Sequence, residues 1–282
     1  MDNYFCGWYY KCQSKEQTLA LIPALHISEG RRSCSLQLIS NKGNWNISLS
    51  APDAEIQPNK PVSVFENAAF REDGIDLSIH EKDFTATGSL QFSGLTPIQY
   101  DIMGPFRYMP FMECRHSVFS MRHRVNGCLA IDGTCYCFRN ADGYIEGDRG
   151  HSFPKYYAWT QCFFPEGSLM LSVAEIPLGP IQFTGIIGII QFNEKEYRLA
   201  TYLGARAVKI NGGNLVVRQG VLTFTASLLE KTSSPLCAPQ NGAMTRTIRE
   251  NVACYARYQL CENGKTVLEF ETTAASFEFE YP

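Results

Sequence analysis

The strongest constraint in this sequence is an alternation of apolar and polar residues with a period of two. Residues 277–281 (FEFEY) alternate without a break, and residues 35–38 and 46–49 follow the same pattern. Successive side chains of a β-strand point to opposite faces, so this pattern predicts half-buried strands. We find no stretch with the period of roughly 3.6 residues that marks an amphipathic helix.

Asp-Gly and Asn-Gly dipeptides recur between these runs. Both residue types tolerate positive φ, which tight two-residue turns require, so the dipeptides predict β-hairpins. The six are Asp73-Gly74, Asn126-Gly127, Asp132-Gly133, Asp142-Gly143, Asn211-Gly212 and Asn263-Gly264. The chain is therefore predicted to be all-β and antiparallel, as sandwiches or barrels with very little helix.

Two segments depart from the strand pattern. Residues 96–112 (TPIQYDIMGPFRYMPFM) contain several prolines but are too apolar for a solvated linker, and we expect a buried crossover there. Residues 235–248 (PLCAPQNGAMTRTI) are predicted to form a long loop.

Composition excludes several classes of partner. The 282 residues carry a net charge of −3, which provides no basic field for nucleic acid or for an anionic membrane. The most apolar run, residues 183–190, is far shorter than the roughly 20 residues that span a bilayer. Because the N-terminus has no basic segment followed by an apolar one, we expect a cytoplasmic protein without an integral membrane segment. The oligomeric state stays open.

The 11 cysteines are interpreted as free thiols in a reducing cytosol, because most of them lie in apolar or alternating runs. Cys135 and Cys137 form a C-x-C pair. A zinc site would need more ligands at short spacing, so buried thiols are favoured over a metal site.

The stretch most unlike an ordinary strand is residues 143–162 (GYIEGDRGHSFPKYYAWTQC). Glu146, Asp148, Arg149 and His151 fall within six residues, and large aromatic side chains flank them on both sides. A polar cluster bracketed by apolar rings is what acid–base chemistry in a dry pocket requires, although a solvated loop has the same composition. A second compact polar cluster is Glu113-Cys114-Arg115-His116.

Residues 144–162 resemble the signature of the tocopherol cyclase family, Y-x-E-K-x-W-G-x-x-F-P-x-x-W-x-W-x-Q-C. The start of the chain is similar to the F-E-G-W-Y of that family, with Phe5, Gly7, Trp8 and Tyr9 in matching places. The signature residues that match are Tyr144, Glu146, Gly150, Phe153, Pro154, Trp159, Gln161 and Cys162. The chain departs from the two patterns at Cys6, Gly147 and Arg149, where the family has Glu, Lys and Trp.

The resemblance implies two lipocalin-like antiparallel β-barrels or sandwiches packed with a cleft between them, which we place at residues 1–150 and 151–282. It also implies a reaction without a cofactor, in which an acid protonates an alkene of a prenylated phenol or quinol and the phenol oxygen closes a ring. Two other functions remain open: a carrier of a hydrophobic small molecule, and an isoprenoid hydratase or lyase that uses the same acid.

On this interpretation Glu146 is the acid, and Asp148 or His151 tunes or reloads it. Substrate-binding residues follow from the two clusters and the signature. Trp8, Tyr9, Tyr144 and Trp159 would supply aromatic surface, and His116, Arg115, Arg149 or Gln161 would supply polar contacts, for example to orient a hydroxyl. Glu113 and Glu175 are reserve carboxyl partners. The structural alternative for Glu146 is a buried ion pair with Arg149 or Arg115.

Overall fold

The computed structural model describes residues 3–49, 54–109, 112–178, 181–230 and 233–282. Within them the chain is almost entirely strand with two short 3₁₀ helices, and the prediction of an all-β protein is confirmed. The chain divides into two compact units. Unit 1 comprises Met1–Ile98, Cys114–Ser152 and Pro239–Thr245, and unit 2 comprises Gln99–Glu113, Phe153–Ala238 and Arg246–Pro282. Both units are discontinuous in sequence, and the single division between residues 150 and 151 stays a prediction.

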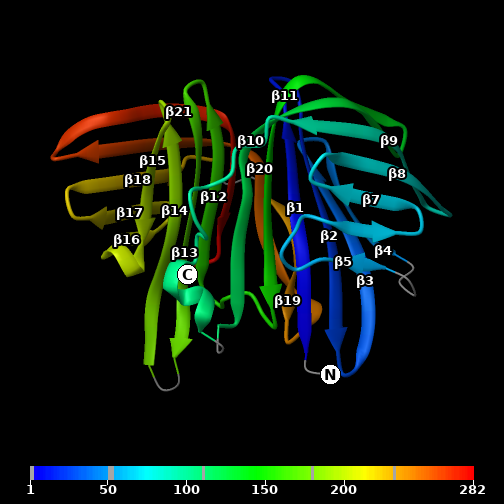
Figure 1. The fold of residues 1–282 in the computed structure, drawn as a ribbon, viewed down its shortest axis with the longest axis horizontal. Helices are drawn as coiled ribbons and strands as arrows, with labels where there is room; N and C mark the ends of the chain where they lie inside the picture. The colour runs from blue at the N-terminus through cyan, green and yellow to red at the C-terminus, as the bar shows by residue number, and fades with distance from the viewer. Residues whose placement is uncertain (1–2, 50–53, 110–111, 179–180, 231–232) are drawn as a thin grey trace. The chain divides into compact units, whose positions relative to one another are not determined.

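The sheet of unit 1 has eleven antiparallel strands in the spatial order β4-β3-β2-β1-β11-β10-β9-β8-β7-β6-β5 (Figure 1). Sequence neighbours are also spatial neighbours, except that β1 pairs with β11 and that β4 and β5 end the order on opposite sides. The strands are β1 (Tyr4–Gln13), β2 (Thr18–Ser28), β3 (Arg31–Ser40), β4 (Gly43–Leu49), β5 (Glu55–Ile56), β6 (Ser63–Phe65), β7 (Ala68–Arg71), β8 (Gly74–Glu81), β9 (Phe84–Ser93), β10 (Cys114–Ile131) and β11 (Thr134–Gly150).

The sheet of unit 2 has the spatial order β15-β14-β13-β12-β21-β20-β18-β17-β16, and β19 pairs with β20. No helix among the described residues is long and apolar enough to cross a membrane. The elements are η1 (Gly104–Tyr108), β12 (Tyr157–Phe164), β13 (Gly167–Leu178), β14 (Ile181–Phe192), β15 (Lys195–Ala200), η2 (Thr201–Leu203), β16 (Arg206–Asn211), β17 (Asn214–Gln219), β18 (Leu222–Leu228), β19 (Ser234–Gln240), β20 (Ala243–Glu262) and β21 (Lys265–Phe279).

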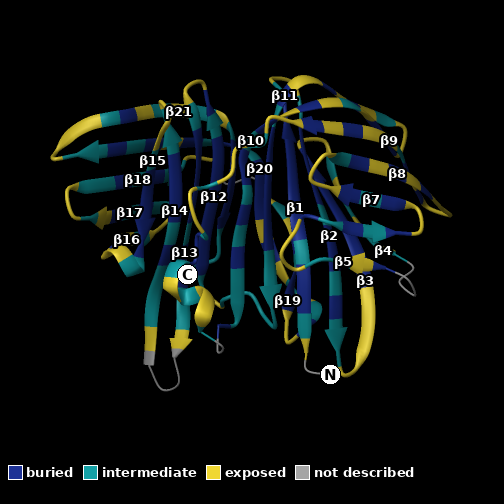
Figure 2. Cartoon of the chain, viewed as in Figure 1, coloured by how far each residue is buried: buried dark blue, intermediate teal, exposed yellow. Residues whose placement is uncertain are grey.

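Each unit has its own hydrophobic core, built by the alternation seen in the sequence. In β8, Ile75, Leu77 and Ile79 are buried in the core of unit 1 while the residues between them are exposed. Several strands are instead buried on both faces. Nearly every residue of β1 is buried, polar ones included (Figure 2). Strands covered on both sides are where a polar side chain needs a specific partner.

Two of the six predicted turns are wrong. Asn126-Gly127 lies inside β10 and Asp142-Gly143 lies inside β11, whereas the other four dipeptides lie at strand ends. Gly127 has φ +122° at an irregularity in the β10–β11 pairing, so a glycine is needed there to form a bulge. Gly143 makes room for a ring, because a Cβ there would lie 2.2 Å from Nε2 of His123.

The two irregular segments also differ from expectation. Residues 235–248 are not a loop: they form most of the β19–β20 hairpin, which turns at Asn241-Gly242. The described residues of the segment 96–112 form no strand, as predicted, and include η1. The burial of this segment is partial, because Ile102 and Met103 are buried while Tyr108 is 79% exposed. Residues 110 and 111 lie outside the described residues.

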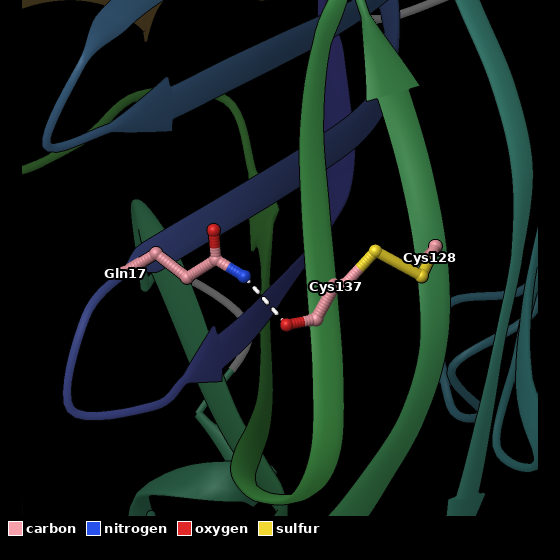
Figure 3. The surroundings of a disulfide bond; sticks show 3 residues. All are labelled: Gln17, Cys128 and Cys137. Atoms are coloured by element: carbon pink, nitrogen blue, oxygen red, sulfur yellow. Dashed lines mark hydrogen bonds between the residues drawn. A yellow bond between two sulfur atoms is a disulfide. The ribbon is translucent and has the colours of Figure 1, made fainter.

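One cysteine pair contradicts the interpretation of all cysteines as free thiols. Cys128 of β10 and Cys137 of β11 are cross-strand partners and form a disulfide (Figure 3). Both residues are exposed, as is Cys135, so the C-x-C pair is not buried either. The alternation correctly places Cys135 and Cys137 on one face, but that face is turned to solvent. Sequence alone could not show that β10 brings Cys128 opposite Cys137.

Mass spectrometry after alkylation checks this disulfide. Under denaturing, non-reducing conditions we expect nine alkylated cysteines, rising to all 11 after reduction. Cys128→Ser should free Cys137, so the unreduced count should rise from nine to ten. Eleven alkylated cysteines without reduction would contradict the disulfide.

Candidate functional site

The polar stretch of the sequence forms the end of β11, which pairs with β1 on one side and β10 on the other. Tyr144, Glu146 and Asp148 are separated by single residues, and the intervening Ile145 belongs to the core of unit 1. Because successive side chains of a strand alternate, the phenol and the two carboxylates share the sheet face that points away from that core.

His116 of β10 links these side chains into a chain of contacts. It is the cross-strand partner of Asp148, and its Nδ1 lies 2.9 Å from Asp148 Oδ1. Its Nε2 lies 3.1 Å from Glu146 Oε2, and the hydroxyl of Tyr144 donates a hydrogen bond of 2.6 Å to the same Glu146 oxygen. The order of contacts is therefore Tyr144–Glu146–His116–Asp148.

Burial decreases along this chain. Tyr144 is fully buried and Glu146 is 4% exposed, whereas the side chain of Asp148 is 24% exposed. His116 stands between them at 9%. Asp148 is therefore the member best placed to exchange a proton with water, and Glu146 is the carboxyl that the protein shields from it.

The electrostatics fix the protonation of two members. Burial acts to lower the pKa of His116, but the negative charges of Asp148 and Glu146 and the hydrogen bonds to both outweigh it, so the pKa lies well above its ordinary value. Burial, with the nearby Glu146 charge, raises the pKa of Tyr144 well above 10. At neutral pH the site thus holds an imidazolium and a neutral phenol.

Two residues of β1 complete this face. Tyr9 lies opposite Glu146 and Lys11 lies opposite Tyr144 in the β1–β11 pairing. Side chains directly opposite each other in an antiparallel pair point to the same face, so both share the face of the acid cluster. Tyr9 is 8% exposed and Lys11 is fully buried. Lys11 was not among the predicted site residues. The only feature of the sequence that could have indicated it is a charged residue within an otherwise apolar strand.

The donor set His116, Glu146 and Asp148 has one ligand atom of each residue within 4.8 Å of the others, a spacing that a metal ion could bridge. The contacts argue for proton sharing instead. The two carboxylates meet opposite nitrogens of the ring, and an ion bound to one nitrogen would reach both carboxylates only after the ring had turned. The arrangement in place can hold, move and release protons.

Other predicted site residues lie on the core-facing side of the same sheet. Trp8 belongs to the core of unit 1, and its Nε1 donates to the carbonyl oxygen of Gln57 at 2.8 Å. Gly147 lies beneath its indole, because a Cβ there would be 2.7 Å from Cε3 of Trp8. Arg149, two residues further along β11, points to this side as well, together with its partner Arg115. The alternative ion pair of Glu146 with Arg149 or Arg115 is replaced by the contact with His116.

The remaining predicted residues follow β11 or belong to unit 2. His151 follows β11, and its Nδ1 lies 3.3 Å from Ser152 Oγ. Glu175 belongs to unit 2, where it accepts a hydrogen bond of 3.2 Å from Thr184 Oγ1. Glu113, Trp159 and Gln161 also belong to unit 2. The sequence analysis placed His116 among the substrate contacts, whereas the structure makes it the bridge between two carboxylates.

Cys114 was not predicted as a site residue. It precedes His116 on the same face of β10, and its Sγ donates to Asp148 Oδ1 at 3.3 Å. The only sequence signal for it is its position in the compact cluster Glu113-Cys114-Arg115-His116.

Comparison with known proteins identifies the fold alone. No family model matches the chain, and no curated protein matches it. Solved structures do match: CghA at a TM-score of 0.65 and 10% identity, covering 98% of this chain and 88% of that one. Kievitone hydratase from Nectria haematococca matches at a TM-score of 0.57 and 10% identity, covering 99% of this chain and 89% of that one. This chain therefore shares its two-sheet, all-β fold with those proteins.

Proposed function

We propose that this protein is an acid–base enzyme that needs no cofactor and adds a proton to an alkene of a hydrophobic, isoprenoid-like small molecule. The observation that carries the proposal is the buried chain Tyr144–Glu146–His116–Asp148. Protonation of an alkene requires a carboxyl group held away from water, with other groups able to resupply its proton.

The roles follow from the contacts. The raised pKa of His116 means that its proton is held tightly, so a carboxyl group is the better donor to a weakly basic alkene. The His116 proton crosses the 3.1 Å contact to Glu146, which transfers it to one alkene carbon, and the other carbon becomes a tertiary cation. A nucleophilic O–H group then attacks the cation, and the proton that it loses returns through Glu146 to His116. Tyr144 and His116 orient the carboxyl group, and Asp148 exchanges protons with water.

The nucleophile decides between two reactions that share this first step. A hydroxyl of the substrate itself would close a ring, as in the tocopherol cyclases that the sequence resembles, and the product would be an isomer. Attack by water would instead hydrate the alkene, which is the type of reaction that the name kievitone hydratase describes for that protein. The 10% identity to that protein supports neither reaction over the other.

Deuterium labelling tests the proposal directly. The purified protein would be incubated in D₂O with a phenol that carries an ortho-prenyl chain, and the products analysed by mass spectrometry and NMR. We expect one deuterium bound to carbon per product molecule, either in an isomeric ring or in an alcohol that has gained one water. Recovery of the ligand unlabelled, although it binds, would overturn the enzyme proposal and favour a carrier.

A further inference from the structure

Arg115 and Arg149 form an unusual pair on the core-facing side of the unit 1 sheet. They are direct cross-strand partners on β10 and β11, and Cys6 of β1 is the partner of Arg149 on its other side. The three side chains therefore form a row across three adjacent strands. The Glu146 cluster occupies the opposite face, so these arginines and that cluster cannot contact the same atoms of one small ligand.

Like charges directly opposite each other in a sheet destabilise it, and both arginines here are half-buried as residues. The Nη1 of Arg149 donates to the carbonyl oxygen of Pro58 at 2.5 Å and to Ser117 Oγ at 3.5 Å, and both acceptors are neutral. Across the described parts of the chain, no carboxylate lies within ion-pair distance of Arg149. The positive charge of this guanidinium is thus solvated and hydrogen-bonded but not neutralised by a side chain.

Two hydroxyl groups accompany the arginines. Ser117 keeps its own hydrogen available for donation while it accepts from Arg149. Tyr4 is two residues from Cys6 and shares its face. Burial, the neighbouring Cys6 and a hydrogen bond with the Cys6 side chain raise the pKa of Tyr4, and the charges of Arg149 and Arg115 act on it in the opposite direction. The Tyr4 hydroxyl is therefore neutral and lies within the field of both guanidinium groups.

We propose that Arg115, Arg149, Ser117 and Tyr4 form a binding site for an oxyanion, the carboxylate or phosphate group of a small molecule. Guanidinium groups present planar pairs of N–H donors that match the oxygens of such groups, and a bound anion would neutralise the charge of Arg149. This site is separate from the acid cluster and does not depend on the reaction proposed for it.

Isothermal titration calorimetry with three probes tests the site: inorganic phosphate, octanoate and the uncharged octanol. We expect saturable binding of phosphate or octanoate, with affinity lowered roughly tenfold or more by Arg149→Gln. Binding of phosphate identifies a free or phosphorylated anion, and binding of octanoate alone identifies a carboxylate with an apolar tail. Arg139→Gln, an exposed arginine of the same strand, is the matched control and should bind like the wild type.

The result that overturns the proposal is an affinity that Arg149→Gln and Arg139→Gln change equally, or binding of octanol as tight as that of octanoate. The absence of saturable binding by either anion overturns it too. Glu146→Gln should keep the anion affinity, so failure of the proposed enzyme activity would leave this result unchanged. Circular dichroism of each variant confirms that the fold is retained.

Discussion

Replacing His116 with glutamine is expected to lower the free energy of unfolding by about 3–5 kcal/mol at neutral pH, because the buried carboxylate of Glu146 and the partly exposed one of Asp148 would lose the cation between them. The pH dependence follows from the raised pKa of His116 in the folded state. The contribution of the imidazolium is fully present below the unfolded pKa of about 6.5, and it is lost as the pH rises through the folded pKa. The deficit of the variant should therefore shrink in alkaline solution.

Chemical denaturation of both proteins at a series of pH values measures this deficit. His80→Gln is the matched control, because His80 is exposed on β8 of the same unit, and it should change stability little. Asp148→Asn keeps the contact between His116 and Glu146 and should cost less than His116→Gln, which keeps the test usable if the latter does not fold. A deficit below about 1 kcal/mol, or one that grows with rising pH, would contradict the buried ion triad.

The sequence predicted strands well where one face is buried and the other is exposed, as in β8, because alternation then reports burial directly. The prediction failed in the long hairpin β10–β11, where Asn126-Gly127 and Asp142-Gly143 lie within the strands and form no turn. Gly127 is needed for a bulge and Gly143 for the close approach of a neighbouring ring, and both reasons depend on tertiary structure. The β19–β20 hairpin was missed because its prolines and Gly242 have the composition of a loop.

The candidate site was predictable only in part. Glu146, Asp148 and Tyr144 are close in sequence and recognisable as a cluster, but the bridge comes from His116, whose position depends on the β10–β11 register. No local pattern gives that register. Alternation would have separated Arg149 from Glu146, because residues an odd number of positions apart in a strand point to opposite faces. The structure shows that this simple rule holds here.

Three departures from the tocopherol cyclase pattern gather in one place, and the fourth, Tyr157 where the pattern has Trp, belongs to unit 2. Cys6, Gly147 and Arg149 all point to the core-facing side of the sheet, and Cys6 is the cross-strand partner of Arg149. None of them belongs to the Tyr144–Glu146–His116–Asp148 chain. These three differences therefore alter the side of the sheet that we assign to anion binding, and they leave the acid cluster unchanged. This separation is why our proposal combines the acid chemistry that the resemblance implies with a different ligand contact.

Glu146→Gln is expected to reduce turnover of a confirmed substrate by about 100-fold or more, which is the usual contribution of a general acid. An amide keeps the shape of the side chain and can still accept the hydrogen bond from Tyr144, but it has no proton to deliver and none to recover. Incorporation of deuterium from D₂O should fall by the same factor, because the label enters in the step that Glu146 performs. Substrate affinity should change much less than turnover.

Two further variants separate chemistry from general damage. Glu81→Gln removes an exposed carboxyl at the end of β8 and should keep full activity. Tyr144→Phe removes one hydrogen bond to Glu146 but no proton carrier, so its loss of turnover should be smaller, roughly tenfold. Full turnover in Glu146→Gln would mean that the buried chain only braces the sheet. An equal loss in Tyr144→Phe would instead assign the delivered proton to the phenol.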